Sequence, residues 1–192
     1  MTEATITKKK ESTAKLNTKT ITVIGVMTAI ICIMGPMSLT LPVSPVPISL
    51  GTLAIYFIPY VLGMKKGTIS CCVYLLIGLV GLPVFTGFSS GPAKLLGPTG
   101  GYLIGYIFMT LICGVVIDRT NKVPVCFLGM VLATAVLYLF GTVWLTYQAS
   151  MTFREALMAG VIPFIPGDLA KMVIAMLVGP QIKKRLKKAG LV

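Results

Sequence analysis

Residues 160–179 read GVIPFIPGDLAKMVIAMLVG, an apolar run in which Asp168 and Lys171 are the only charged residues. A helix of about 20 apolar residues is long enough to cross a hydrocarbon core about 30 Å thick. Charged side chains are costly inside such a helix unless they face protein or a cavity, and a spacing of three residues puts both on one helix face. The run therefore predicts a membrane-spanning helix whose charged face points into the protein.

The rest of the chain has the same apolar character. Of its 192 residues, 56% are hydrophobic and 11% are charged, and the mean hydropathy is +0.93. We expect an all-α integral membrane protein whose six transmembrane helices lie near residues 21–41, 50–64, 68–82, 99–117, 124–147 and 160–179. The expected organisation is a basic arm at residues 1–19, a transmembrane domain at 20–182 and a basic tail at 183–192.

The basic residues predict the orientation. With the N-terminus inside, the cytoplasmic segments carry 14 Lys and Arg residues, whereas the outer loops carry only Lys94 and Arg154. This asymmetry favours cytoplasmic N- and C-termini. The net charge of +12 is grouped at the ends of apolar segments, so we expect membrane lipid as the partner of these residues and no nucleic acid.

The sequence lacks the residues and motifs that are typical of several classes of protein. The chain contains no histidine, no GxxxxGK[ST] phosphate loop and no GxGxxG motif after a strand, and its five cysteines lie in apolar runs without CxxC spacing. We therefore expect no metal site, no cofactor and no nucleotide site. If the protein depends on ATP, a partner must hydrolyse it.

Asp168 and Lys171 are the strongest candidates for a functional site. One alternative is an ion pair that only neutralises itself, and another is a Lys171 side chain that reaches the membrane interface. Pro166 and Gly167 precede the pair and should loosen the helix. Irregular backbone at membrane depth usually lines a cavity, which favours a ligand site.

A second candidate is the junction GPTGGY at residues 97–102. A helix that starts here would offer free amides to a carbonyl or carboxylate, which makes Thr99, Gly100 and Tyr102 candidate ligand contacts. The alternative is close helix packing, because glycines recur every four residues at 97, 101 and 105. Both interpretations can hold together.

Three further features have two interpretations each. Gly25 and Ala29 are small residues four apart that could dock a partner helix or pack internally. Trp144 and Tyr147 could belong to an aromatic belt at the membrane interface or form a stacking wall for a ring-shaped ligand. Residues 83–98 exceed the usual connection of about 4–6 residues, and their apolar anchors favour an ordered lid over disorder.

Three stretches resemble the signatures of a known family, the BioY proteins. They are SPVPISLGT at residues 44–52, GPAKLLGPTGGY at 91–102 and PFIPGDLAK at 163–171. BioY proteins are the biotin-binding S-components of energy-coupling factor (ECF) transporters, which work with a transmembrane coupling protein and two cytoplasmic ATPases. The resemblance implies the six-helix S-component fold in a prokaryotic plasma membrane, with an outward pocket capped by the first and third outer loops.

The resemblance also implies what the candidate residues do. Asp168, Lys171 and Lys94 would bind biotin, which would be a transported ligand and not a cofactor, and Gly25 and Ala29 would contact the coupling protein. The protein would be a transporter subunit without enzymatic activity. The alternative is a small secondary transporter coupled to protons through Asp168, and an intramembrane enzyme is a third option.

Overall fold

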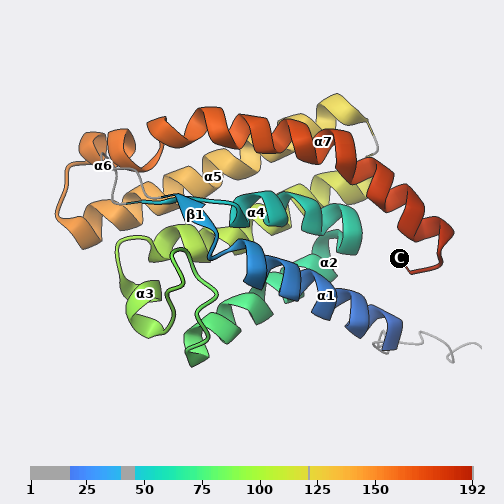
Figure 1. The fold of residues 1–192 in the computed structure, drawn as a ribbon. Coiled ribbons are helices and arrows are strands. Elements are labelled where there is room, and N and C mark those ends of the chain that lie inside the picture. Colours follow the sequence, from blue (N-terminus) through green and yellow to red (C-terminus); the bar gives the residue numbers. More distant parts are fainter. Residues whose placement is uncertain (1–17, 40–45, 121, 192) are drawn as a thin grey trace, which may run out of the picture.

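The structure is a computed structural model that describes residues 18–39, 46–120 and 122–191, with backbone only at Leu39. The regular elements of these residues are helices and one short β hairpin (Figure 1). The elements in chain order are α1 (Thr18–Met34), β1 (Ser38–Leu39), β2 (Ile48–Ser49), α2 (Gly51–Val80), α3 (Pro92–Leu96), α4 (Gly100–Arg119), α5 (Val123–Ala149), α6 (Phe153–Gly160), the 3-10 helix η1 (Ile162–Phe164) and α7 (Ile165–Lys188).

Helix α2 consists of two arms that meet at Gly63. This residue has φ 70° and ψ −173°, a conformation that glycine adopts without the cost of a side chain. Asp118 at the end of α4 accepts a hydrogen bond from the Met64 amide at 2.8 Å, and a Cβ at Gly63 would lie 2.9 Å from Asp118 Oδ1. The two arms correspond to the predicted second and third helices. The predicted turn at Lys65 to Gly67 is wrong, since those residues are helical.

Six long helical segments therefore make up the fold: α1, the two arms of α2, α4, α5 and α7 (Figure 1). Four stretches of helix are long and apolar enough to cross a membrane, whereas α1 is apolar but has only 17 residues. Helix α1 ends at Met34, before the predicted end at Leu41, because Pro36 disfavours helix at the residue before it. The chain then enters the hairpin, where β1 pairs with β2 antiparallel.

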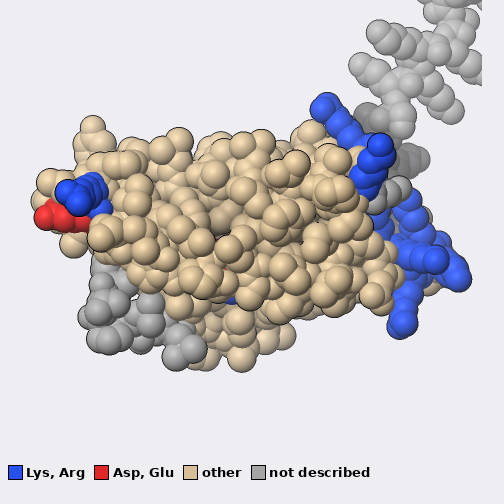
Figure 2. All heavy atoms as spheres, turned by 90° about the horizontal axis from the view of Figure 1, so that it is seen from above, with Lys and Arg blue, Asp and Glu red and all other residues tan. Residues whose placement is uncertain are grey.

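The surface fits a membrane-embedded molecule. Figure 2 shows most Lys and Arg side chains gathered at the two ends of the molecule, with a broad uncharged band between them. Leu128, Leu132 and Leu139 on α5 are 66%, 57% and 60% exposed. Apolar side chains at such exposure suit contact with lipid. The more basic end holds the Gly63 turn, the end of α4, the start of α5 and the C-terminal part of α7.

The chain after α5 differs from the prediction. Helix α6 occupies most of the stretch between the predicted helices at 124–147 and 160–179. It starts with a capping box in which Thr152 and Glu155 satisfy each other's backbone amides. The last long helix begins at Ile165 and continues to Lys188, so the basic residues from Lys183 to Lys188 form its final turns. Most of the predicted N-terminal arm, residues 1–17, lies outside the described residues.

The segment between α2 and α4 is folded against the bundle, as predicted. Phe85 is fully buried and meets the Tyr74 ring edge to face at 5.6 Å. The Tyr74 hydroxyl donates to the Val84 carbonyl at 3.2 Å, and the Gly87 amide donates to the Pro36 carbonyl at 3.2 Å. These contacts hold the loop next to the β hairpin. The loop and the hairpin both line one end of a cavity inside the bundle.

Candidate ligand-binding site

A cavity of about 50 Å³ lies inside the bundle, between the first arm of α2, α4, α5 and the start of α7. Hydroxyl groups and one charged pair supply most of its polar surface. Its lining residues are Val46, Pro47, Ser49, Thr52, Thr86, Thr99, Tyr102, Leu103, Tyr106, Leu137, Tyr138, Gly160, Phe164, Asp168 and Lys171. One water molecule needs about 10–15 Å³ of such volume, so the cavity has room for a few waters. A ligand larger than that requires the lining loops to move.

Lys171 is buried, with 7% of its surface exposed, and all three of its ammonium protons have acceptors. Its Nζ lies 2.8 Å from Asp168 Oδ1, 2.8 Å from Thr52 Oγ1 and 2.8 Å from the Ser49 carbonyl oxygen. The side chain therefore joins α7 to the hairpin and to the first turn of α2. It does not extend to the membrane interface.

Asp168 is 4% exposed and lies in the first turn of α7. Besides the ion pair at Oδ1, its Oδ2 accepts a hydrogen bond of 2.6 Å from the Tyr138 hydroxyl of α5. Pro166 is tolerated here because the first helical turn has free amides anyway, and the positive end of the helix dipole favours a carboxylate at this position. The carboxylate is thus held by side chains of α5 and α7.

The hydroxyls around the pair are also held in place. The Ser49 hydroxyl donates to the Gly35 carbonyl and accepts from the Gly51 amide, both at 2.9 Å. Thr52 Oγ1 lies 3.2 Å from the Ser49 carbonyl and 3.4 Å from Asp168 Oδ1, and its one proton can go to either. The hairpin therefore forms one wall of the cavity.

This arrangement can bind a polar group that donates hydrogen bonds. A carboxylate has about four lone-pair positions, and Asp168 uses no more than three of them for Lys171, Thr52 and Tyr138. Lys171 has no donor to spare unless one of its three contacts is released. Apolar side chains such as Leu103, Leu137 and Phe164 suit the uncharged part of a ligand.

Comparisons with known proteins agree with this geometry. The family model described as the BioY family matches residues 7–188. The chain belongs to the BioY family. Among its BioY relatives, the Biotin transporter BioY of Thermotoga maritima is 34% identical over 160 residues, which are 83% of this chain and 93% of the relative. The Biotin transporter BioY of Lactococcus lactis subsp. cremoris is 35% identical over 179 residues, which are 90% and 92% of the two chains.

A solved structure also matches this BioY chain. It is described as the crystal structure of the S-component for biotin from an ECF-type ABC transporter. The TM-score is 0.79 and the sequence identity is 31%, and the match covers 86% of this chain and 91% of the solved one. The predicted S-component fold with six helical segments is therefore confirmed.

Within this BioY fold, four of the predicted ligand residues line the cavity: Asp168, Lys171, Thr99 and Tyr102. Thr99 occupies the N-cap of α4, and its side chain makes no capping hydrogen bond. Gly100 does not line the cavity. A Cβ there would lie 1.7 Å from the Leu95 carbonyl oxygen, so this glycine serves the tight contact between α3 and α4.

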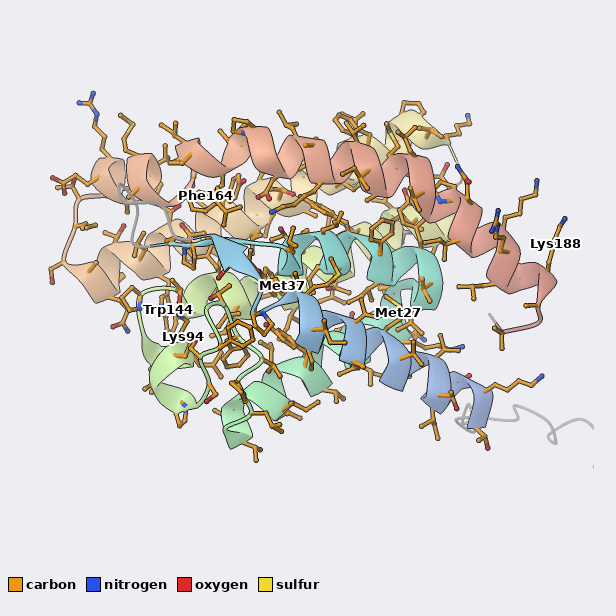
Figure 3. The ribbon with its side chains drawn as sticks, viewed as in Figure 1. Met27, Met37, Lys94, Trp144, Phe164 and Lys188 are labelled. Carbon is orange, nitrogen blue, oxygen red and sulfur yellow. The ribbon has the colours of Figure 1, made fainter. Side chains whose placement is uncertain are left out.

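The other three predicted ligand residues lie outside the cavity lining. Tyr147 is 84% exposed on the outside of α5. The Trp144 indole donates to the Gly97 carbonyl at 2.9 Å, so it fastens the start of α4 to α5, a role that neither earlier interpretation included. Figure 3 shows Lys94 on α3 and Trp144 on α5, and partial burial lowers the pKa of the Lys94 ammonium.

The small residues have two different surroundings. A Cβ at Gly101 would lie 2.3 Å from Trp144 Cβ, and one at Gly105 would lie 2.6 Å from Leu137 Cδ1. These two glycines allow α4 and α5 to pack closely, as predicted. By contrast, Gly25 and Ala29 are exposed on α1, and a Cβ at Gly25 would meet nothing within 4 Å. Internal packing of that face is therefore wrong for the described residues.

Sequence reasoning missed Tyr138 and did not single out Ser49 and Thr52. Tyr138 is a polar residue within the apolar run of α5, and that could have marked it as a candidate. Ser49 and Thr52 lie in the stretch that resembles the family signature, and Ser49 acts through its backbone carbonyl. A main-chain acceptor has no signal of its own in a sequence.

Proposed function

We propose that this chain is the biotin-binding S-component of an ECF-type importer, which captures biotin from the outer side and delivers it together with a coupling protein and two ATPases. The observation that carries this proposal is the buried Asp168 and Lys171 pair in the cavity of a BioY-family fold. Biotin has a compact apolar ring system, a ureido group with two donors and one acceptor, and a tail that ends in a carboxylate.

The chemistry of the cavity supports a specific role for each member of the pair. In our proposal Asp168 accepts a ureido N–H through its remaining lone pair, and Lys171 holds Asp168 and the hairpin in position through its three contacts. The hydroxyls of Thr99 and Tyr102 remain candidate polar contacts. Lys94 could meet the biotin carboxylate only after the loop that carries it moves.

The two partner surfaces are part of the same proposal. Gly25 and Ala29 lie on an exposed face of α1, where a helix of the coupling protein could approach closely. The basic end of the molecule would face the cytoplasm of a prokaryotic cell, because positively charged loops stay on that side. The described chain then needs no nucleotide site, since the ATPases supply that function.

Proton coupling through Asp168 is a poorer match to the site. Protonation of this carboxylate would break the ion pair with Lys171 and leave a buried ammonium with an uncompensated charge. The names of the relatives also point to biotin transport.

Equilibrium binding to the detergent-purified chain tests the proposal. Labelled biotin should bind saturably at one site per chain, and unlabelled biotin should displace it. Lipoate is the matched competitor, because it has the same carboxylate tail but no ureido group, and it should compete poorly. Absence of saturable biotin binding by monodisperse protein, or equal competition by lipoate, would contradict the proposed ligand.

A further inference from the structure

We infer that the basic end of the bundle holds a second binding site, which takes the phosphate headgroup of an anionic phospholipid. This site lies under the C-terminal part of α7, where that helix extends past the bundle (Figure 1). It is separate from the cavity around Asp168, which shares no lining residue with it. The inference does not depend on the ligand proposed for that cavity.

Two adjoining cavities of about 270 and 290 Å³ form the polar part of the site. Tyr60, Lys183 and Lys187 line both of them, so the two cavities are direct neighbours. The remaining lining residues are Ile117, Thr120, Val123, Cys126, Pro180 and Lys184 in the first, and Pro59, Val61, Leu62, Gly63, Lys66 and Asp118 in the second.

The Tyr60 hydroxyl is the observation that points to a ligand. Tyr60 is 3% exposed, and its hydroxyl has no nitrogen or oxygen partner among the described residues; its polar neighbour is the Cys126 thiol, a weak hydrogen-bonding group. Its ring packs against Gly179 of α7, where a Cβ would lie 2.4 Å from the ring. A buried hydroxyl whose only polar neighbour is a thiol is poorly compensated, so a stronger acceptor is expected to reach it when the site is in use.

The charges around this hydroxyl favour an anion. Lys183 Nζ donates to the Ile117 carbonyl at 2.9 Å and is half-buried, whereas Lys184 and Lys187 are exposed and have no partner among the described residues. Asp118, the acidic residue of the lining, is already engaged by the Met64 amide at 2.8 Å. Ammonium groups without partners beside a weakly partnered hydroxyl donor match the oxygens of a phosphate group.

An apolar hollow of about 460 Å³ adjoins the polar one and shares Val61 with it. Its lining comes from α1, α2, α7 and the chain just after α7, and it is almost entirely apolar: Thr22, Val23, Val26, Met27, Ile30, Ala54, Phe57, Val61, Ile182, Leu186 and Leu191. A phosphate site next to an apolar groove fits a molecule with a charged headgroup and an acyl chain. This combination selects a phospholipid over free phosphate.

Lipid retention measured by native mass spectrometry tests the inference on the full chain. Delipidated protein is mixed with phosphatidylglycerol, with phosphatidylcholine as the zwitterionic reference. Lys184→Gln with Lys187→Gln should weaken phosphatidylglycerol binding at least about tenfold, since each lysine near an anionic headgroup contributes about fivefold. The control is Arg185→Gln with Lys188→Gln, which removes the same charge from the same helix outside the lining, and it should bind as the wild type does.

Tyr60→Phe tests the hydroxyl without changing the net charge. It should weaken phosphatidylglycerol binding several-fold while the protein stays folded, because the hydroxyl it removes has only the weak Cys126 thiol as a protein partner. Equal loss in both lysine double variants would overturn the inference, since that result indicates general charge attraction. Displacement of the lipid by millimolar inorganic phosphate would overturn the choice of a lipid. Unchanged lipid binding combined with lost assembly with the coupling protein would identify an acidic protein surface as the occupant instead.

Discussion

Lys171 Nζ and Asp168 Oδ1 lie 2.8 Å apart on successive turns of α7, and each group also holds a different part of the bundle. Lys171 contacts the hairpin and α2, while Asp168 accepts from Tyr138 of α5. The ion pair therefore does more than neutralise two charges. It couples the hairpin to two helices around the cavity, α2 and α5, which links ligand binding to the stability of that end of the protein.

Asp168→Asn should weaken biotin binding by about 1.5 to 3 kcal/mol, the range for a hydrogen bond to a charged group. Isothermal titration of the purified variant measures this. Asp118→Asn is the control, because it changes a carboxylate at the opposite end of the bundle and should leave the biotin Kd unchanged. An unaltered Kd in folded Asp168→Asn protein would remove Asp168 from the proposed site.

Thr52→Val should lower the free energy of unfolding in the absence of biotin by about 1 to 3 kcal/mol. The change keeps the side-chain shape and removes one of three acceptors of the buried Lys171 ammonium. Thermal unfolding in detergent measures the loss. Thr146→Val is the matched control, since that hydroxyl bonds only to the Thr142 carbonyl of its own helix. Equal shifts in the two variants would show that the Lys171 contact contributes nothing special.

Ala29→Trp should leave biotin binding intact and abolish ATP-driven uptake. A bulky ring on the exposed face of α1 separates two helix backbones that must approach closely. Pull-down of the coupling protein and uptake into vesicles containing the complete transporter measure the two effects. Leu132→Trp places the same ring at a 57% exposed position of α5 and should assemble normally. Intact pull-down with Ala29→Trp would exclude this face as the docking surface.

Biotin should slow hydrogen exchange in residues 86–97 more than in residues 122–126. Thr86 lines the cavity and the loop is anchored by Phe85, so an opening that releases biotin becomes rarer when biotin is bound. At a biotin concentration 100 times Kd, such an opening costs about 2.7 kcal/mol more, which corresponds to about hundredfold slower exchange. Equal protection of both segments would mean that the loop is a passive connection.

Gly101→Ala and Gly25→Ala should change stability in opposite directions. A methyl group at Gly101 meets Trp144 Cβ at 2.3 Å, so it should cost about 1 to 3 kcal/mol by forcing α4 and α5 apart. At Gly25 a Cβ meets nothing within 4 Å, and alanine favours a helix by up to about 1 kcal/mol over glycine. Thermal unfolding of both variants compares them directly, and the same sign for both would contradict close packing at Gly101.

The sequence alone predicted the membrane character, the helical class and the six long helical segments, and four of these segments, the two arms of α2, α4 and α5, lie within about four residues of their predicted bounds. Long apolar runs and prolines are local properties, and the bilayer turns them directly into helices. The turn in α2 was placed wrongly, at Lys65 to Gly67, because two charged residues and a glycine interrupt the apolar sequence there. Asp118 of α4 accepts from the Met64 amide beside Gly63, and that long-range contact belongs to the tertiary structure.

The site residues also fall into those that the sequence reveals and those that only the tertiary structure brings to the cavity. Asp168 and Lys171 stand out in the sequence, since a charge inside an apolar helix needs a partner wherever the helix lies. Tyr138 and Tyr147, by contrast, look alike in the sequence, because both are tyrosines in the apolar run of α5. They are about two and a half helical turns apart and therefore lie on opposite faces of α5. Only the packing of α5 against α4 and α7 decided that Tyr138 faces Asp168 at 2.6 Å while Tyr147 is 84% exposed, because helix rotation depends on contacts between distant residues.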